Sequence, residues 1–493
     1  MFENAELGNK IDRETYRREE PELRAALLKA QHELAAANFS VVISVAGIEG
    51  AGKAETVNLL LAWLDARGVQ THAMVEQTDE ESEHPPMWRY WRLLPPTGRI
   101  GIFFGAWETG PFLDRVFKRI SRGELDRVLD RVIEFERMLA NENTLQVKFW
   151  LHLSKAAQKK RFRKLENDPA QSWRVTSRDW KLYRRYNRVR SVAEHLLRRT
   201  GTAEAPWHII EGSDRRYRDL TVARTLLAAL RARLDRPKDP PACPPPEPDT
   251  LRPPERNVLN QLDLTLALDE KEYESQLYAS QGELARLTRR LHDVGHSMIL
   301  VFEGPDAAGK GGTIRRLTAA MDARDYRVIS VAAPTDEERA HPYLWRFWRH
   351  LPRRGRVTIY DRSWYGRVLV ERIEGFARPD EWQRAYHEIN VFEEQLVEFG
   401  MVVLKFYLVL SPEEQLRRFQ ERQTTPYKQY KITEEDWRNR AKWDAYEAAA
   451  CEMIEKTSSE RAPWVPVEAN NKEWARIKVM RTIIDRLTGL FST

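Results

Sequence analysis

Residues 301–312 combine an apolar segment, closely spaced glycines and one lysine, which together suit the binding of an anion. Gly304, four further residues, Gly309 and Lys310 match the phosphate-binding loop pattern. Glycines let consecutive backbone N–H groups turn toward one anion, and the N-terminus of the next helix adds positive charge. The lysine then reaches the outer phosphate as a point charge. The residues expected around the phosphate are Gly304, Ala308, Gly309, Gly311, Gly312 and Thr313.

The position after the lysine departs from the usual pattern. The Ser/Thr that normally holds Mg²⁺ there is Gly311, and Thr313 comes two positions too late. Asp306, inside the loop, is the substitute that we expect to hold the metal.

A second pair of chemically capable residues follows the apolar segment 357–360. An aspartate at the end of such a strand, beside a phosphate loop, is the usual Mg²⁺ anchor, and this predicts that role for Asp361. Arg362 can contact the transferring phosphate. The predicted catalytic residues are Asp306, Lys310, Asp361 and Arg362, and the predicted metal is Mg²⁺, with Mn²⁺ as the alternative, on Asp306 and Asp361.

No His or Cys nucleophile and no paired acid and base stand out in the sequence. An acceptor that is itself a phosphate is already ionised at neutral pH, so its transfer chemistry needs only positioning and charge neutralisation. The sequence therefore favours a phosphate acceptor over an alcohol.

Residues 415–419 and 424–431 form a basic cluster that follows a strand and a helical turn. Small kinases with a phosphate loop place an arginine-rich lid at this point, which closes over the phosphates and excludes water. We expect a lid here; an ordinary basic helix and loop is the alternative.

In residues 341–349, tryptophans and arginines recur at helical spacing. The tryptophans favour core packing, and Arg346 or Arg349 fits an anion channel or a plain surface equally well.

The loop occurs twice. Gly47 and Gly304 lie 257 positions apart, as do Lys53 and Lys310, and from residue 78 to 99 there are 14 identities in 22 positions with residues 335–356. The offset persists over roughly 165 residues, which indicates a tandem duplication of one domain. Residues 237–254 between the copies contain nine prolines and predict a stiff, extended linker.

Comparison of the two copies indicates which one is catalytic. Phe104 stands at the position of Asp361, Gly105 at that of Arg362, and Glu49 at that of Asp306. A phenylalanine cannot bind Mg²⁺. The second copy is therefore predicted to be catalytic and the first to be degenerate.

Each copy alternates Val/Ile-rich segments with helical ones, the pattern of a parallel sheet covered by helices on both faces. The strands expected in the second copy are residues 298–302, 327–331, 357–360, 402–410 and 464–467, and residues 313–321 are expected to form a helix after the loop. The predicted domains are residues 1–236, the linker 237–256 and residues 257–493. Residues 1–236 and residues 257–493 are each expected to form an α/β phosphate-loop kinase-like domain with a five-stranded parallel sheet and a helical lid.

Composition sets broad limits. The 493 residues carry 31% charged side chains and a net charge of +6, which suits a polyanionic partner, although so small an excess by itself favours a solvated surface with exposed ion pairs. No apolar run approaches a membrane span, the N-terminus does not resemble a secretory signal, and two cysteines indicate neither a disulfide framework nor a zinc site. A cytoplasmic protein is expected.

The motifs at 304–312, 360–365 and 370–372 resemble those of the polyphosphate kinase 2 family. The resemblance covers both halves of the chain. A fused pair with the second copy intact is similar to the subgroup in which polyphosphate phosphorylates AMP to ADP. It implies a helical lid, Mg²⁺ dependence, and inorganic polyphosphate and AMP or ADP as partners. The further binding residues that it implies are Arg372, Arg418, Lys428 and Lys431.

Three alternatives stay open at this stage. One is an ATP-dependent nucleoside monophosphate kinase, and another is a family member that phosphorylates ADP. The third is a non-catalytic scaffold for a polyanion such as nucleic acid, which the intact second loop argues against. The sequence does not determine the oligomeric state, and a homo-oligomer stays among the alternatives.

Overall fold

The computed structural model describes residues 1–74, 76–236 and 251–492. The chain forms two compact units. The first consists of Met1–Gln77, Arg89–Lys238 and Pro334–Arg346, and the second of Thr78–Trp88, Asp239–Ala333 and Phe347–Thr493. Residues 237–250 of the predicted linker lie outside the described residues, and the predicted domain boundaries stay predictions.

The first unit contains a five-stranded sheet in the order β2-β3-β1-β4-β5, in which all neighbours pair in parallel. The central strands are buried on both faces, which explains their near-continuous runs of Val, Ile and aromatic residues. The strands are β1 (Ser40–Gly47), β2 (Val69–Ala73), β3 (Ile100–Phe104), β4 (Thr144–His152) and β5 (Trp207–Glu211).

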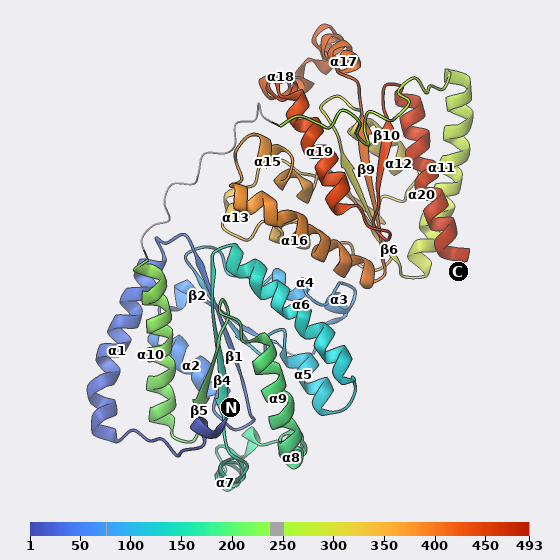
Figure 1. Cartoon of the computed structure of the whole chain (residues 1–493). Coiled ribbons are helices and arrows are strands. Elements are labelled where there is room, and N and C mark those ends of the chain that lie inside the picture. Colours follow the sequence, from blue (N-terminus) through green and yellow to red (C-terminus); the bar gives the residue numbers. More distant parts are fainter. Residues whose placement is uncertain (75, 237–250, 493) are drawn as a thin grey trace. The chain divides into compact units, whose positions relative to one another are not determined.

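Helices cover both faces of this sheet (Figure 1). One face packs against α1 (Arg13–Leu34), α2 (Lys53–Trp63) and α10 (Arg215–Leu234). The other packs against α5 (Thr109–Val116), α6 (Arg122–Asn141) and α9 (Tyr186–Thr200). Between β4 and α9 the chain forms α7 (Lys155–Glu166), a short 3-10 helix (Ser172–Arg174) and α8 (Ser177–Arg184).

The second unit repeats this sheet in the order β10-β9-β6-β8-β7, again all parallel. The strands are β6 (Ser297–Glu303), β7 (Tyr326–Ser330), β8 (Val357–Asp361), β9 (Met401–Val409) and β10 (Trp464–Glu468). Their bounds agree with the expected segments to within about one residue. The predicted fold, a duplicated five-stranded parallel sheet between helices, is confirmed.

One face of the second sheet carries α11 (Glu270–Asp293), α12 (Lys310–Thr318) and α20 (Lys472–Ser492) (Figure 1). The other carries α15 (Val370–Ile373), α16 (Pro379–Glu398) and α19 (Trp443–Thr457). The segment between β9 and α19 contains α17 (Pro412–Thr424), a 3-10 helix (Pro426–Lys431) and α18 (Glu434–Ala441). This is the segment in which we expected the lid. Shorter helices elsewhere are α3 (Asp79–Ser82), α4 (Trp88–Trp91), α13 (Asp336–Arg339), α14 (Trp345–Trp348) and three 3-10 helices (Glu3–Ala5, Ala66–Gly68, Trp364–Arg367).

The helix after the second loop begins earlier than expected. It starts at Lys310 rather than at Thr313, because Gly309 already adopts a left-handed conformation with φ 107° and caps the helix. The loop lysine therefore lies in the first helical turn, close to the N–H groups that the turn leaves unpaired.

Each unit buries one lysine–glutamate pair at the same alignment position. Lys405 Nζ donates to Glu393 Oε2 at 2.6 Å and to the carbonyl of Thr457 at 2.7 Å. Lys148 contacts Glu136 at 2.6 Å and the carbonyl of Thr200 at 2.8 Å. The shared contact shows that the duplication extends to the interior of the fold.

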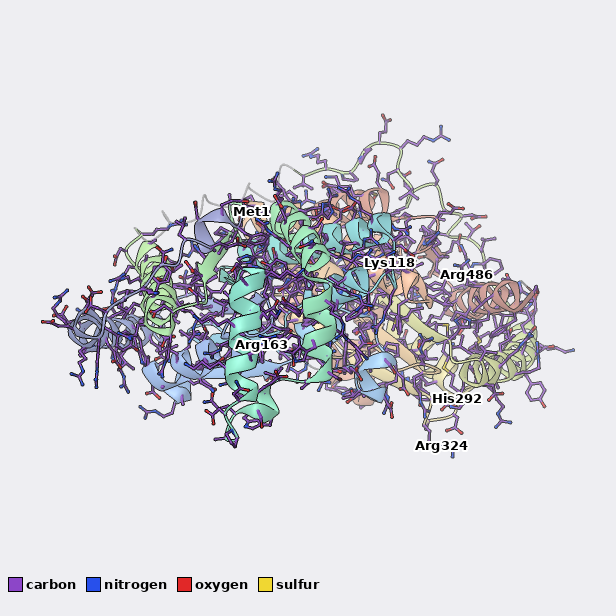
Figure 2. The ribbon with its side chains drawn as sticks, turned by 90° about the horizontal axis from the view of Figure 1, so that it is seen from below. Met1, Lys118, Arg163, His292, Arg324 and Arg486 are labelled. Carbon is purple, nitrogen blue, oxygen red and sulfur yellow. The ribbon has the colours of Figure 1, made fainter. Side chains whose placement is uncertain are left out.

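No helix in the described part of the chain is both long enough and apolar enough to cross a membrane. Many basic side chains are exposed, Arg163, Arg324 and Arg486 among them (Figure 2).

Replacing Lys405 with alanine tests the buried pair. The change leaves the Glu393 carboxylate buried without its cation, which typically costs about 3–5 kcal/mol. We expect this loss in the free energy of unfolding of the second unit, measured by urea unfolding with circular dichroism. The exposed pair of Arg324 and Asp322 is the control, and Arg324→Ala should produce no measurable change. Equal stability of Lys405→Ala and the unmodified chain would contradict the expectation.

Candidate active site

The second glycine-rich loop leaves the carboxyl end of β6, the central strand, and runs into α12. Gly304 has φ 135°, and a Cβ atom at this position would lie 2.5 Å from the carbonyl oxygen of Leu408. Only glycine satisfies both constraints. The close approach of β9 therefore fixes the start of the loop.

Lys310 is held inside the loop and is only 9% exposed. Its Nζ atom donates to the carbonyl of Gly304 at 2.6 Å and to that of Pro305 at 3.2 Å. Burial lowers the pKa of Lys310, and the neighbouring Arg362 acts in the same direction. Two carbonyls orient the ammonium group at the point where the sequence predicts the outer phosphate.

Asp306 joins the loop to the end of β8. Its Oδ1 atom accepts from Arg362 Nη2 at 2.7 Å, and its Oδ2 atom accepts from Asn439 Nδ2 of α18 at 2.9 Å. Burial alone would raise the pKa of Asp306, but Lys310 and Arg362 outweigh it and the pKa lies below its ordinary value. The carboxylate is therefore ionised at neutral pH, as a metal ligand must be.

Asp361 lies beside the same loop. It ends β8 and pairs in register with Phe302 of β6. A Cβ atom on Gly311 would lie 3.7 Å from Asp361 Oδ2, so the carboxylate contacts the first turn of α12 where the usual Ser/Thr is missing. The structure thus brings together all four predicted catalytic residues: Asp306, Lys310, Asp361 and Arg362.

Arg362 adopts a left-handed backbone conformation with φ 62°, which is rare for a residue other than glycine. Its amide donates to the carbonyl of Phe302 at 3.0 Å, so the turn is fixed to β6. Ala307, in the loop, has a similar φ of 65°. Strained backbone of this kind tends to gather at functional sites.

Sequence reasoning missed two residues of this cluster. Glu303 is buried at the end of β6, accepts from Ser363 Oγ at 2.8 Å, and has a pKa raised by burial. The sequence signal for Glu303 was the presence of an acid in an apolar strand, at the position where the first copy has Ala46. No sequence signal pointed to Asn439, because its counterpart in the first copy is Leu182 and its segment has the pattern of an ordinary polar helix.

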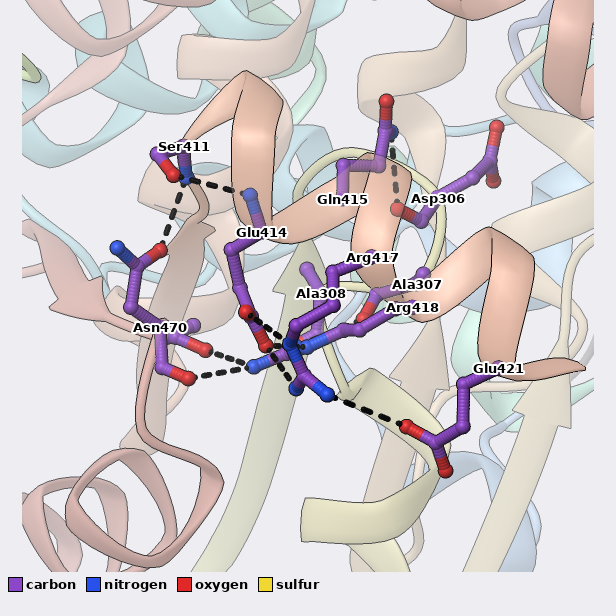
Figure 3. Close-up of polar contacts among 11 residues, drawn as sticks. Asp306, Ala307, Ala308, Ser411, Glu414, Gln415, Arg417, Arg418, Glu421 and Asn470 are labelled. Carbon is purple, nitrogen blue, oxygen red and sulfur yellow. Dashed lines mark hydrogen bonds and ion pairs between the residues drawn. The ribbon is translucent and has the colours of Figure 1, made fainter.

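Arg418 occupies a different place from the one expected of a lid residue. Its guanidinium is buried, and Figure 3 shows it directed at the loop backbone. It donates to the carbonyls of Ala307 at 2.8 Å and Ala308 at 3.2 Å. On the other side it contacts the carbonyls of Ala469 at 2.6 Å and Asn470 at 2.8 Å.

Its remaining donor, Nε, contacts Glu414 Oε1 at 2.7 Å. In this arrangement all five N–H groups have acceptors within the protein. Arg418 therefore fastens the loop from its carbonyl side, and a direct contact with phosphate stays a prediction.

Other expected binding residues are engaged internally. Arg372 lies in α15, where its guanidinium stacks on Trp382 at 3.9 Å and donates to Glu452 at 2.7 Å. Thr313 is buried and its hydroxyl donates to the carbonyl of Gly309 at 3.2 Å. The side chains of Lys428 and Lys431 lie outside the described residues. Binding by these four residues stays a prediction.

The first loop differs in charge. Lys53 pairs with Glu49 at 2.8 Å and contacts the carbonyl of Gly47 at 3.0 Å. Glu55, aligned with Gly312, lies in the first turn of α2 and pairs with Arg161 at 3.0 Å. It also contacts Arg174. Two carboxylates of the protein itself thus pair with the basic groups in and around this loop.

The donor set of the second loop fits a magnesium ion. Mg²⁺ is usually held by one or two carboxylates together with substrate phosphates and water, rather than by a cage of protein ligands. Asp306 and Asp361 supply such a pair. Among the described residues no group of three or more His, Cys, Asp or Glu side chains is placed to hold a metal ion.

Comparison with known proteins shows a match to one family in both halves of the chain. The model of the family described as polyphosphate kinase 2 matches residues 10–238 and again 267–490. The chain is 52% identical to the polyphosphate:AMP phosphotransferase of Pseudomonas aeruginosa, over 100% of this chain and 99% of that protein. It is 49% identical to the protein of the same name from Pseudomonas syringae pv. tomato, over the same shares.

A crystal structure described as a polyphosphate kinase 2 from P. aeruginosa is similar over 100% of both chains, with 50% identity and a TM-score of 0.89. Two family matches in tandem, relatives of equal length and a shared fold leave one conclusion: the chain belongs to the polyphosphate kinase 2 family.

Proposed function

We propose that the protein transfers the terminal phosphoryl group of inorganic polyphosphate to AMP and releases ADP. The observation that carries the proposal is the intact cluster of Asp306, Lys310, Asp361 and Arg362 in the second unit of a chain with two family repeats. The full-length relatives named polyphosphate:AMP phosphotransferase share this two-repeat length, which supports AMP as the acceptor.

The residues of the second unit supply positioning and charge for this transfer. The loop amides and Lys310 bind the terminal phosphate of the donor, and Arg362 neutralises charge on the group in transfer. The phosphate of AMP is already ionised, so no general base is required. Arg418 keeps the loop carbonyls turned away, which leaves the loop amides free to face the anion.

A magnesium ion bound by Asp306 and Asp361 would neutralise charge on the phosphate oxygens. In the structure the carboxylate of Asp306 is paired with Arg362 and Asn439. If a metal displaced Arg362 from Asp306, the guanidinium would be free to contact the phosphate.

The first unit is proposed to be non-catalytic. It keeps Lys53 but carries Phe104 and Gly105 at the positions of Asp361 and Arg362. Its loop lysine is paired with Glu49. We propose that this unit contributes to the stability of the chain rather than to turnover.

An assay of donor and acceptor tests the main proposal. ADP should form from AMP with polyphosphate and Mg²⁺, and removal of the metal with EDTA should abolish the reaction. ADP formation only with ATP as donor would support a nucleoside monophosphate kinase instead. Faster turnover of ADP than of AMP would place the chain with relatives such as the ADP-polyphosphate phosphotransferase of P. aeruginosa, which is 36% identical over 227 residues.

The two loop lysines form a matched pair for assigning the active unit. Lys310→Ala should lower kcat by about 100- to 1,000-fold, because it removes a preorganised charge from the transferring phosphate. Lys53→Ala should leave kcat within about twofold of the unmodified enzyme. Steady-state kinetics with saturating polyphosphate and AMP measures both. Equal losses would overturn the assignment of catalysis to the second unit.

Asp306→Asn tests the proposed metal ligand. Loss of an outer-shell partner typically costs about 10- to 100-fold in metal affinity, so loss of a direct carboxylate should raise the Mg²⁺ concentration for half-maximal rate by at least that factor. Glu49→Gln is the aligned control in the first unit and should leave the Mg²⁺ titration unchanged. An unchanged midpoint in Asp306→Asn would exclude Asp306 as a metal ligand.

A further inference from the structure

Glu55 lies in the first turn of α2, two residues after the loop lysine of the first unit. Its Oε1 atom accepts from Arg161 Nη2 at 3.0 Å and also from Arg174 Nη2. Arg161 belongs to α7, and Arg174 belongs to the 3-10 helix that follows α7. Two segments that lie 106 and 119 positions further along the chain thus converge on one carboxylate.

The two arginines stand at positions where the second unit carries predicted binding residues. At the 257-residue offset, Arg161 aligns with Arg418. Arg174 aligns with Lys431 at the same offset. The first unit therefore keeps both basic positions, and it adds a carboxylate that pairs with the two side chains.

The carboxylate of Glu55 has the surroundings that suit an anion. Burial alone would raise the pKa of Glu55, but its own backbone N–H group and Arg174 outweigh burial, and the pKa lies below its ordinary value. The N–H groups in the first turn of a helix have no partner within the helix and favour a negative charge. Glu55 thus brings to this turn and to two guanidinium groups the charge that a bound anion would bring.

The space beside the first loop is also filled by the protein itself. Arg218 is only 3% exposed, and a Cβ atom on Gly52 would lie 2.0 Å from its Nη1 atom. In the second unit Ala475 stands at the position of Arg218. A Cβ atom on Gly309 would meet no atom of the described residues within 4 Å, apart from its own neighbours in the chain. The two loops therefore differ in the room that they leave for a ligand.

We propose that Glu55 is an internal substitute for phosphate, whose carboxylate takes the place of an anion on Arg161 and Arg174 and closes the first loop to polyphosphate. The choice of polyphosphate as the excluded anion rests on the proposed function, whereas the contact itself does not. A first loop that bound polyphosphate would hold the donor in a unit that has no counterpart of Asp361. The internal carboxylate leaves the donor to the second unit.

The alternative role for Glu55 is that of an ordinary acid at the N-terminus of a helix. Such an acid interacts with the helix dipole and needs no partner from another segment. Glu124, in the first turn of α6, is an acid of this kind, because its carboxylate accepts from the amide of Ser121 in the same turn at 2.6 Å. Glu55 instead pairs with cations from two other segments, which favours the role of a substitute ligand.

Glu55→Gly in the full-length protein tests the proposal, because it places the residue of the second unit in the first. Isothermal titration calorimetry with inorganic tripolyphosphate counts the binding sites. We expect one site more per chain than in the unmodified protein, since Arg161 and Arg174 lose their carboxylate. Addition of Lys53→Ala should remove the extra site, which assigns it to the first loop. Glu124→Gln is the matched control and should leave the number of sites unchanged.

Gly312→Glu makes the reciprocal change in the second unit and tests the proposal if Glu55→Gly does not fold. Outside its own helix, a Cβ atom on Gly312 would lie no nearer than 3.6 Å to a described residue, at Arg476 Nη2, so a side chain fits there. We expect the dissociation constant of tripolyphosphate to rise about tenfold or more, because a like charge then faces the ligand. Gly312→Gln, which has the same shape without the charge, should raise it much less.

Three results would overturn the proposal. One is an unchanged number of sites in a Glu55→Gly chain that melts at the temperature of the unmodified chain, and another is an extra site that survives Lys53→Ala. The third is equal affinity of Gly312→Glu and Gly312→Gln for tripolyphosphate. An extra site in Glu55→Gly, in a chain that shows no turnover of AMP, would uphold the closed first loop and reject the proposed function instead.

Discussion

The ion pair between Asp306 and Arg362 is the contact on which the site depends. It joins the loop after β6 to the turn after β8, at the carboxyl edge of the sheet. Both backbones are constrained there: Gly304 lies against β9, and Arg362 holds a positive φ. Two neighbouring parallel strands, β6 and β8, thus place the opposite charges of Asp306 and Arg362 side by side. The pair therefore holds the loop and the turn together at the edge of the sheet where the candidate site lies.

Helix α17 adds a second support for the loop. Arg418 binds the carbonyls of Ala307 and Ala308, and Gln415 Nε2 donates to the carbonyl of Asp306 at 3.0 Å. Because a peptide unit with its carbonyl held on one side directs its N–H toward the other, these contacts favour a loop whose amides face the ligand. Gln158 makes the equivalent contact with the carbonyl of Glu49 at 3.0 Å, so both units share the glutamine part of this support.

The fold and the charged cluster could be predicted from the sequence because both are local patterns. Buried Val/Ile runs mark the strands, and the 257-residue offset marks the duplication. Asp361 and Arg362 stand out because they follow an apolar strand directly. The role of Arg418 could not be predicted, since a basic helix does not reveal whether a guanidinium faces a ligand or the carbonyls of another segment. The contacts of Asn439 and the cavity beside Tyr446 could not be predicted either, because they depend on segments that lie far apart in the sequence.

The two loops differ in the group that pairs with the loop acid. Glu49 differs from Asp306 by one methylene, and that longer reach lets it pair directly with Lys53 at 2.8 Å. In the second unit the shorter carboxylate pairs with Arg362 instead, and Lys310 donates hydrogen bonds to the carbonyls of Gly304 and Pro305. A lysine held by neutral carbonyls keeps its charge available to a phosphate, whereas one paired with a carboxylate must first break an ion pair. The first copy has Gly105 at the position of Arg362, so its loop acid has no arginine at that position to pair with.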